Sequence, residues 1–371
     1  MTLNKNDNKT DEKITFDTIK KKDKNYVMNN YNRFDLAIKK GSNSTCYDYE
    51  NNKYIDFTSG IGVNSLGFCN ENWQNAVINQ VKTLNHTSNL YYTNPGAELA
   101  KMLCEKTGGK KVSFANSGAE TNECAIKCAR KYSFDKYSHA FGTNRHKIIT
   151  LENSFHGRTI TTLSATGQDV FHKFFNPFTE GFLFAKANDF QSVEDLTDET
   201  VCAIMIEAIQ GEGGVVPLEK DFILKISKLC EEKDILLIFD EVQTGIGRTG
   251  SFFAYEQFGV KPDIVTSAKG LGGGLPIGAT IFFEKCENVF SFGDHGTTFG
   301  ANPICCAGAI SVLNQLDDNF LNSILQKGEI LKSYLLQNPL VENICGMGLM
   351  LGIKLKNNIS STAVAKKAIE N

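Results

Sequence analysis

The middle of the chain contains short apolar runs separated by helical stretches, and this pattern is what most constrains the fold. The apolar runs cover residues 147–151, 201–206, 235–239 and 264–266, and the helical stretches cover residues 97–106, 119–132 and 221–233. Runs that are apolar on both faces and separated by helices are typical of parallel strands in a helix-covered sheet. The sequence therefore predicts an α/β fold, with ligands bound at the strand ends, where Gly and Ser gather.

Charge balance and cysteine pattern exclude several classes of protein. The 371 residues include 39 basic and 42 acidic residues, which argues against a strongly basic nucleic-acid binder. No apolar run approaches the roughly 18 residues of a membrane helix, and the N-terminus lacks the apolar segment of a secretory signal. The 11 cysteines form no C-x-x-C pair, so we expect no metal site and a reducing compartment. We expect a soluble cytoplasmic protein without nucleic-acid or membrane partners.

The two ends of the chain differ from its middle. Residues 1–24 are polar and mixed in charge, which predicts a flexible arm. Residues 47–57 (YDYENNKYIDF) predict a β-hairpin whose turn lies at residues 50–52. From residue 320 the pattern predicts a helix, then an apolar run at residues 345–355, then the start of another helix.

The strongest candidate site combines a carboxylate and a lysine. Asp240 directly follows the apolar run 235–239, and Lys269 follows the next predicted strand and precedes the glycine-rich stretch 271–276. At the ends of neighbouring buried strands, both side chains face the same crevice. Taken singly, Asp240 is equally explained as a helix cap and Lys269 as a surface lysine. Together they favour a site, because a flexible glycine-rich stretch is costly without a purpose.

This pair fits the requirements of pyridoxal phosphate. A lysine in a desolvated crevice forms a Schiff base with an aldehyde, and the cofactor also needs a carboxylate at its ring nitrogen. Its phosphate needs an anion site, which Ser117, Gly118 and Ala119 supply at the start of a predicted helix. Taken alone, these three residues are better explained as an ordinary helix cap.

Residues 154–159 (SFHGRT) follow the predicted strand at residues 147–151. Phe155 can stack on a flat cofactor ring, and Arg158 can bind a substrate carboxylate through two parallel hydrogen bonds. Taken alone, Phe155 is more often a core residue and Arg158 a surface ion pair. We expect His156 to be a structural hydrogen-bonding group rather than the catalytic base, because Lys269 already fills that role.

Six segments occur together in an order that matches a known family. They are NSGAETNE, SFHGRT, IQGEGGV, IFDEVQTGIGRTG, TSAKGLGGGLPIGA and HGTTFGANP. With them, the chain resembles the class III pyridoxal-phosphate aminotransferases from about residue 25 to residue 355, and within them the subgroup that uses acetylornithine. The resemblance implies a fold-type I architecture, with a mainly parallel central sheet covered by helices, and a homodimer with shared active sites.

The resemblance also implies a domain organisation. A large cofactor-binding domain is expected at residues 65–312. A smaller α+β domain is expected from both chain ends, at residues 25–64 and 313–371, with its C-terminal part incomplete.

The resemblance assigns roles to individual cofactor-binding residues. Lys269 is expected to form the Schiff base and then to move the proton between substrate and cofactor carbons. Asp240 is expected to pair with the ring nitrogen. The remaining expected cofactor contacts are Ser117, Gly118 and Ala119 at the phosphate, Phe155 and Val242 against the ring, Gln243 at the ring hydroxyl, Glu241 beside Asp240, and Thr298 of the partner subunit at the phosphate.

The resemblance implies transamination of N2-acetylornithine with 2-oxoglutarate, giving N-acetylglutamate 5-semialdehyde and glutamate, a reaction of arginine biosynthesis. Arg158 is expected to bind the α-carboxylate of acetylornithine, with Thr297 nearby and Glu212 in the substrate site. Ornithine or another ω-amino acid is the alternative donor. Relatives that use ornithine are expected to carry a Tyr where this chain has Ile61, although Ile61 is equally explained as a packing residue.

The sequence departs from the family pattern at several positions. Ala208 replaces an expected Pro, and Cys345 replaces an expected Arg. Relatives are also expected to continue beyond the C-terminal residue of this chain, through a strand whose Arg pairs with the counterpart of Glu212. A catalytically impaired, cofactor-binding remnant is therefore a second hypothesis. The joint presence of four residues favours the enzyme: Lys269, Asp240, Arg158 and Thr298.

Overall fold

The computed structural model describes residues 13–141, 145–357 and 359–371, and the chain divides into two compact units. The smaller unit comprises the described residues within Met1–Ser59, Gly67–Asn70 and Ile359–Asn371. The larger unit comprises those within Gly60–Leu66 and Glu71–Asn358. None of the helices in the described part of the chain is long and apolar enough to span a bilayer.

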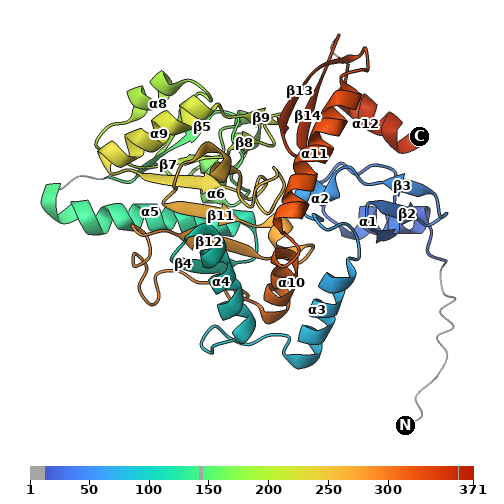
Figure 1. Cartoon of the computed structure of the whole chain (residues 1–371), viewed down its shortest axis with the longest axis horizontal. Helices are drawn as coiled ribbons and strands as arrows, with labels where there is room; N and C mark the ends of the chain where they lie inside the picture. Colours follow the sequence, from blue (N-terminus) through green and yellow to red (C-terminus); the bar gives the residue numbers. More distant parts are fainter. Residues whose placement is uncertain (1–12, 142–144, 358) are drawn as a thin grey trace. The chain divides into compact units, whose positions relative to one another are not determined.

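A seven-stranded sheet with the order β4-β12-β11-β10-β7-β5-β6 forms the centre of the larger unit (Figure 1). Its strands are β4 (Lys111–Ala115), β5 (Lys147–Leu151), β6 (Phe182–Ala185), β7 (Val201–Ile206), β10 (Leu236–Asp240), β11 (Ile264–Ser267) and β12 (Gly278–Phe282). The strands from β11 to β6 pair in parallel, and β12 is antiparallel to both of its neighbours. The mainly parallel sheet is thus confirmed, and β5, β7, β10 and β11 are its predicted strands.

Helices cover both faces of this sheet, which explains why its central strands are apolar on both sides. Ile204 and Ile206 of β7 belong to one hydrophobic core, whereas Ala203 and Met205 belong to another. The first core includes side chains of α4 (Asn94–Thr107) and α9 (Lys220–Lys233). The second includes small side chains of α5 (Gly118–Phe141), which runs along the sheet (Figure 1). All six residues of β7 are buried as a result.

The remaining elements of the larger unit precede, connect or follow the strands of the sheet in the chain. The helices are α3 (Glu71–Thr83), α6 (Ile160–Ala165), α7 (Asp169–His172), α8 (Phe190–Leu196), α10 (Pro303–Leu313) and α11 (Asp318–Leu335), with 3₁₀ turns η1 (Ala254–Phe258) and η2 (Lys269–Gly272). Two short antiparallel pairs are β8 (Ile209–Gln210) with β9 (Val216–Pro217) and β13 (Val341–Met347) with β14 (Met350–Leu355). The turn labelled α2 (Ser59–Gly62) contains left-handed backbone at Gly60 and Ile61.

Most of the C-terminal part of the chain belongs to a different unit from the one that the predicted domain boundaries assign to it. Residues 313–357 belong to the larger unit rather than to the smaller one. The turn between β13 and β14 packs closely on the loop after β10, where Leu349 N donates to Arg248 O at 3.1 Å. A side chain at Gly348 would meet the backbone of Thr249 at 2.6 Å, so this contact depends on glycine. The domain boundaries themselves stay a prediction.

The smaller unit contains a three-stranded antiparallel sheet of β1 (Ile38–Ser42), β2 (Thr45–Asp48) and β3 (Lys53–Ile55), together with α1 (Phe16–Tyr26) and α12 (Ser361–Glu370). The predicted hairpin is confirmed as β2–β3. The predicted flexible arm is wrong from residue 16 onward, because α1 forms there. Thr15 and Thr18 cap this helix reciprocally and so satisfy its first free N–H groups. Residues 1–12 of the predicted arm lie outside the described residues.

Candidate active site

A cavity of about 450 Å³ opens at the carboxyl ends of β10 and β11 in the larger unit. This volume suits a small-molecule ligand. The sequence segments that follow β4, β5, β10 and β11 all contribute to its lining. The predicted site residues among them are Ser117, Gly118, Ala119, Phe155, Arg158, Asp240, Val242, Gln243 and Lys269. The fold therefore brings together the residues that the motifs pointed to separately.

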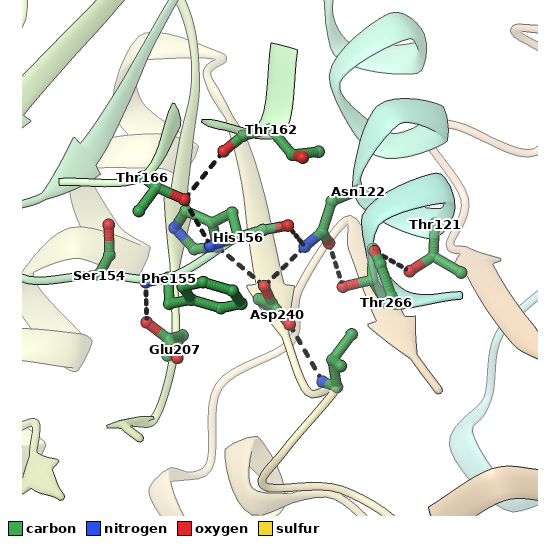
Figure 2. Close-up of polar contacts among 12 residues, drawn as sticks. Thr121, Asn122, Ser154, Phe155, His156, Thr162, Thr166, Glu207, Asp240 and Thr266 are labelled. Atoms are coloured by element: carbon green, nitrogen blue, oxygen red, sulfur yellow. Dashed lines mark hydrogen bonds and ion pairs between the residues drawn. The ribbon is translucent and has the colours of Figure 1, made fainter. Parts of the chain in front are cut away.

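Asp240 ends β10 and is held by three donors, two of which come from other segments (Figure 2). Its Oδ2 accepts hydrogen bonds from Asn122 Nδ2 at 2.7 Å and from His156 Nδ1 at 2.8 Å. Its Oδ1 accepts one from the backbone N–H of Val242 at 3.1 Å. Asn122 is itself fixed, because its Oδ1 accepts a hydrogen bond from Thr266 at the end of β11. These donors stabilise a buried carboxylate and fix its orientation.

His156 is the structural hydrogen-bonding group that the sequence analysis predicted. Burial by itself would lower the pKa of its imidazole, but the hydrogen bond to Asp240 and the charges of Asp240 and Glu207 raise it. Its backbone N–H donates to Thr166, and its backbone oxygen accepts from Asn122. The imidazole therefore supports Asp240 and is not free to act as a base.

Lys269 lies directly after β11, at the first position of η2. Its backbone φ of 43° lies in the left-handed region, which costs about 1–2 kcal/mol for a residue with a side chain. Strain of this kind is concentrated at functional sites. Burial lowers the pKa of the Lys269 amine, opposed by the charges of Asp240, Glu212 and Glu207. A lowered pKa makes the neutral, nucleophilic amine more accessible near neutral pH.

The start of α5 forms the anion-binding part of the cavity. Ser117, Gly118 and Ala119 place free backbone N–H groups where the helix begins. Glycine is required at position 118, because a Cβ atom there would lie 2.6 Å from Val242 Cγ1. The loop before the helix is held by Glu120, whose carboxylate accepts from the backbone and side chain of Asn116.

Phe155 and Arg158 form another wall of the cavity. The backbone N–H of Phe155 donates to Glu207 at 3.0 Å, which ties this loop to the end of β7 (Figure 2). The guanidinium of Arg158 is exposed and lies over the ring of Phe171, with 3.9 Å between Cζ and the ring centroid. Within the described residues no carboxylate pairs with Arg158. An exposed cation without an acidic partner beside a cavity is suited to bind an anionic ligand.

The expectation that Glu241 contacts the cofactor has to be corrected. Glu241 is fully buried and does not line the cavity. Its carboxylate accepts hydrogen bonds from the Thr244 hydroxyl and from the backbone N–H groups of Ala254 and Tyr255. Burial raises the pKa of Glu241 to about 7. Consecutive residues here point in different directions, so Asp240 faces the cavity and Glu241 does not. The Glu241 side chain instead anchors the loop after β10.

The remaining predicted residues also lie outside the cavity lining. Thr297 is adjacent, since its Oγ1 accepts from Asn116 Nδ2 at 3.0 Å. Thr298 and Glu212 are exposed. Ile61, on which the choice between donors was based, is 65% exposed and is not a lining residue.

Two residues of the site were missed in the sequence. Glu207 lines the cavity and is buried, and burial raises its pKa to about 7. It directly follows the apolar strand β7, which is the same signal that identified Asp240. Asn122 also lines the cavity, four residues after Gly118 and therefore on the same face of α5.

The residues present fit pyridoxal phosphate. A buried carboxylate held by donors, a lysine with a lowered pKa and a helix N-terminus match the ring nitrogen, the aldehyde and the phosphate respectively. Phe155 and Val242 provide the apolar surfaces that a flat ring requires.

Comparisons with known proteins agree with this geometry. The aminotransferase class-III family matches residues 26–371. An acetylornithine aminotransferase of Haemophilus ducreyi is 52% identical over 358 residues, covering 96% of this chain and 90% of the relative. The ornithine aminotransferase of Toxoplasma gondii ME49 superposes with a TM-score of 0.91 at 31% identity, covering 96% of this chain and 86% of that one. An acetylornithine aminotransferase of Elizabethkingia anophelis superposes at 0.82 with 29% identity, covering 95% and 88%. The chain therefore belongs to the class III aminotransferases.

Proposed function

We propose that this enzyme transfers the terminal amino group of N2-acetylornithine to 2-oxoglutarate, as in arginine biosynthesis, with pyridoxal phosphate as its cofactor. The products are N-acetylglutamate 5-semialdehyde and glutamate. The observation that carries the proposal is the joint placement of Lys269, Asp240 and Arg158 around one cavity. The choice of donor is supported by the 52% identity to the acetylornithine aminotransferase of Haemophilus ducreyi.

Each residue has a distinct task in this reaction. When bound, pyridoxal phosphate supplies an electron-withdrawing ring that stabilises negative charge on the reacting carbon. Lys269 would hold the cofactor through its amine. Once released, that amine would take a proton from the amine-bearing carbon of the donor and deliver it to the adjoining carbon of the cofactor. Asp240, held by Asn122 and His156, would keep a positive charge at the ring nitrogen. Arg158 binds the α-carboxylate of the donor.

Ornithine is the competing donor, and its preference can be measured directly. We expect kcat/KM for acetylornithine to exceed that for ornithine with 2-oxoglutarate as acceptor, with glutamate formation as the measurement. A small group that fits one pocket discriminates between two substrates by about 1–3 kcal/mol, which corresponds to a ratio of about 10 to 200 in kcat/KM. Equal or faster turnover of ornithine would contradict the choice of donor. Cofactor binding without turnover of either donor would instead support the impaired remnant.

The enzyme is proposed to act as a homodimer with shared active sites. Leu90 is 88% exposed and Tyr92 is fully exposed, which is unusual for large apolar side chains. Asn89 Nδ2 donates to Thr297 O at 3.1 Å, so this apolar segment lies beside the loop that carries Thr298. A partner that covers the segment would therefore lie beside the loop that carries Thr298.

Mixing two inactive variants tests the shared site. If Thr298 acts across the interface, each site takes Lys269 from one subunit and Thr298 from the other. Lys269→Ala and Thr298→Ala then remove groups that different subunits supply to a site. Dimers formed after mixing and subunit exchange then contain one intact site, so activity should rise above the sum of the separate variants. Sedimentation at twice the chain mass of 41.0 kDa is the accompanying expectation. A monomer, or a mixture without gain, would contradict the shared site.

We also propose a cytoplasmic location. All eleven cysteines are free thiols, and eight of them are buried. Free thiols in this number are typical of a reducing compartment.

A further inference from the structure

The guanidinium of Arg158 is supported by an aromatic residue that lies outside the cavity. Arg158 Cζ lies 3.9 Å from the ring centroid of Phe171 and 5.4 Å from that of Phe155. The two rings meet edge to face, with centroids 6.0 Å apart and an interplanar angle of 77°. Phe171 is half-buried and does not line the cavity, so it can act on a ligand only through its neighbours.

We propose that Phe171 is a positioning residue that orients Arg158 for binding of a substrate carboxylate. The proposal rests on the proposed function, in which Arg158 binds that carboxylate. At 3.9 Å from the centroid, the guanidinium carbon lies over the face of the Phe171 ring. The five N–H donors of a guanidinium lie in its own plane, so a guanidinium that stacks on a ring keeps them available. The edge of the guanidinium remains available for a carboxylate that binds through two parallel hydrogen bonds.

Phe171 is well anchored relative to the loop that carries Arg158. It belongs to α7, and the residues just before α7 are tied to Ser154, next to Phe155. Gln168 Nε2 donates to Ser154 O at 3.0 Å, and Gly167 N donates to Ser154 Oγ at 3.1 Å. On the other side of Phe171, the imidazole of His172 lies 2.8 Å from Leu163 O.

This anchoring matters because, in the described part of the chain, no carboxylate holds Arg158, and its other aromatic neighbour, Phe155, lies farther away at 5.4 Å. An exposed arginine samples many rotamers, and a ligand that immobilises it loses part of its binding free energy. A contact with an aromatic face restricts those rotamers before the ligand binds. Phe171 therefore orders the guanidinium before the substrate arrives, and the benefit should be specific to ligands that carry a carboxylate.

The test compares Phe171→Leu and Phe171→Trp with a matched control in the same segment. Phe174→Leu removes a similar ring that is 76% exposed and contacts Lys173 rather than Arg158. The donors are acetylornithine and N-acetyl-1,4-diaminobutane, which lacks only the carboxylate. In the holoenzyme, Phe171→Leu should raise KM for acetylornithine about 3- to 10-fold with kcat nearly unchanged. KM for the decarboxylated donor should not change, Phe171→Trp should restore the wild-type value, and Phe174→Leu should have no effect.

A second measurement does not depend on turnover. N2-acetylnorvaline carries the carboxylate and the acetyl group but has no terminal amine, and its Kd can be measured by calorimetry. Phe171→Leu should weaken its binding by the same factor. Unchanged values for Phe171→Leu, or an equal loss for both donors, would overturn the proposal.

Arg158→Ala separates this proposal from the proposed function. If Arg158→Ala removes the preference for the carboxylate-bearing donor while Phe171→Leu does not reduce it, the positioning role fails and the function of Arg158 stands. If Arg158→Ala retains the full preference, the assignment of Arg158 is wrong and the positioning role falls with it. Circular dichroism of each variant confirms that the fold is retained.

Discussion

Replacing Lys269 by alanine is expected to lower kcat by about 10⁴-fold or more. The variant loses both the covalent attachment of the cofactor and the group that moves a proton at the reacting carbon, and proton transfer alone contributes about 10²–10⁴-fold. The structure supports this double role, because Lys269 lines the cavity and its pKa is lowered by burial. The measurement is glutamate formation from acetylornithine and 2-oxoglutarate.

Lys228→Ala is a suitable control, because Lys228 is an exposed lysine on α9. It should keep the activity of the wild-type enzyme. Borohydride treatment followed by peptide mass mapping provides an independent measurement: the cofactor mass should be found on the peptide with Lys269 and be absent in Lys269→Ala. Attachment at another lysine, or turnover of the variant within tenfold of wild type, would contradict the assignment.

Asp240→Asn is expected to lower kcat by about 10²–10⁴-fold, which is the second large effect. Asparagine has nearly the same shape as aspartate but no negative charge, so it cannot hold a positive charge at the ring nitrogen. The asparagine amide would face one of the three donors around Asp240, on Asn122, His156 and Val242, so some stability is lost as well. The variant should still fold and bind the cofactor while losing turnover, as measured by thermal unfolding, cofactor absorbance and kcat.

The neighbouring carboxylate offers a matched control. Glu241→Gln changes a buried carboxylate that lies outside the cavity. The glutamine amide would face one of the N–H donors of Ala254 and Tyr255, which costs about 1–3 kcal/mol of stability. We expect a lowered Tm with a nearly unchanged kcat for Glu241→Gln, whereas Asp240→Asn should lower kcat strongly. If both variants lose activity equally, the distinction between the two carboxylates is wrong.

Most of the large unit could be predicted because its signals are local. Residues 201–206 are apolar at every position, and such a run is stable only as a strand covered on both faces. Asp240 ends a strand, and Lys269 and Phe155 come shortly after strands, so their common location at one edge of the sheet also follows from the pattern. Helix α1 was missed because polar composition hides a capping signal, here the reciprocal hydrogen bonds of Thr15 and Thr18.

Contacts between distant segments could not be predicted. Asn122 and Asp240 are 118 residues apart in sequence, and His156 and Asp240 are 84 apart. The direction of the Glu241 side chain depends on where the backbone of Ala254 and Tyr255 passes. The placement of Phe171 under Arg158 depends on the short helix α7, for which residues 167–172 show no periodic signal.

The sequence by itself thus determined the α/β class, the strand-end positions of the chemical groups and the family to which they point. These features follow from hydrophobic periodicity and from residue types at strand ends, which are properties of short segments. Only the tertiary structure decided which donors surround Asp240, that Glu241 lies outside the cavity and that Arg158 lies on Phe171. Those contacts join residues through packing of separate elements, and their geometry is not encoded in any single segment.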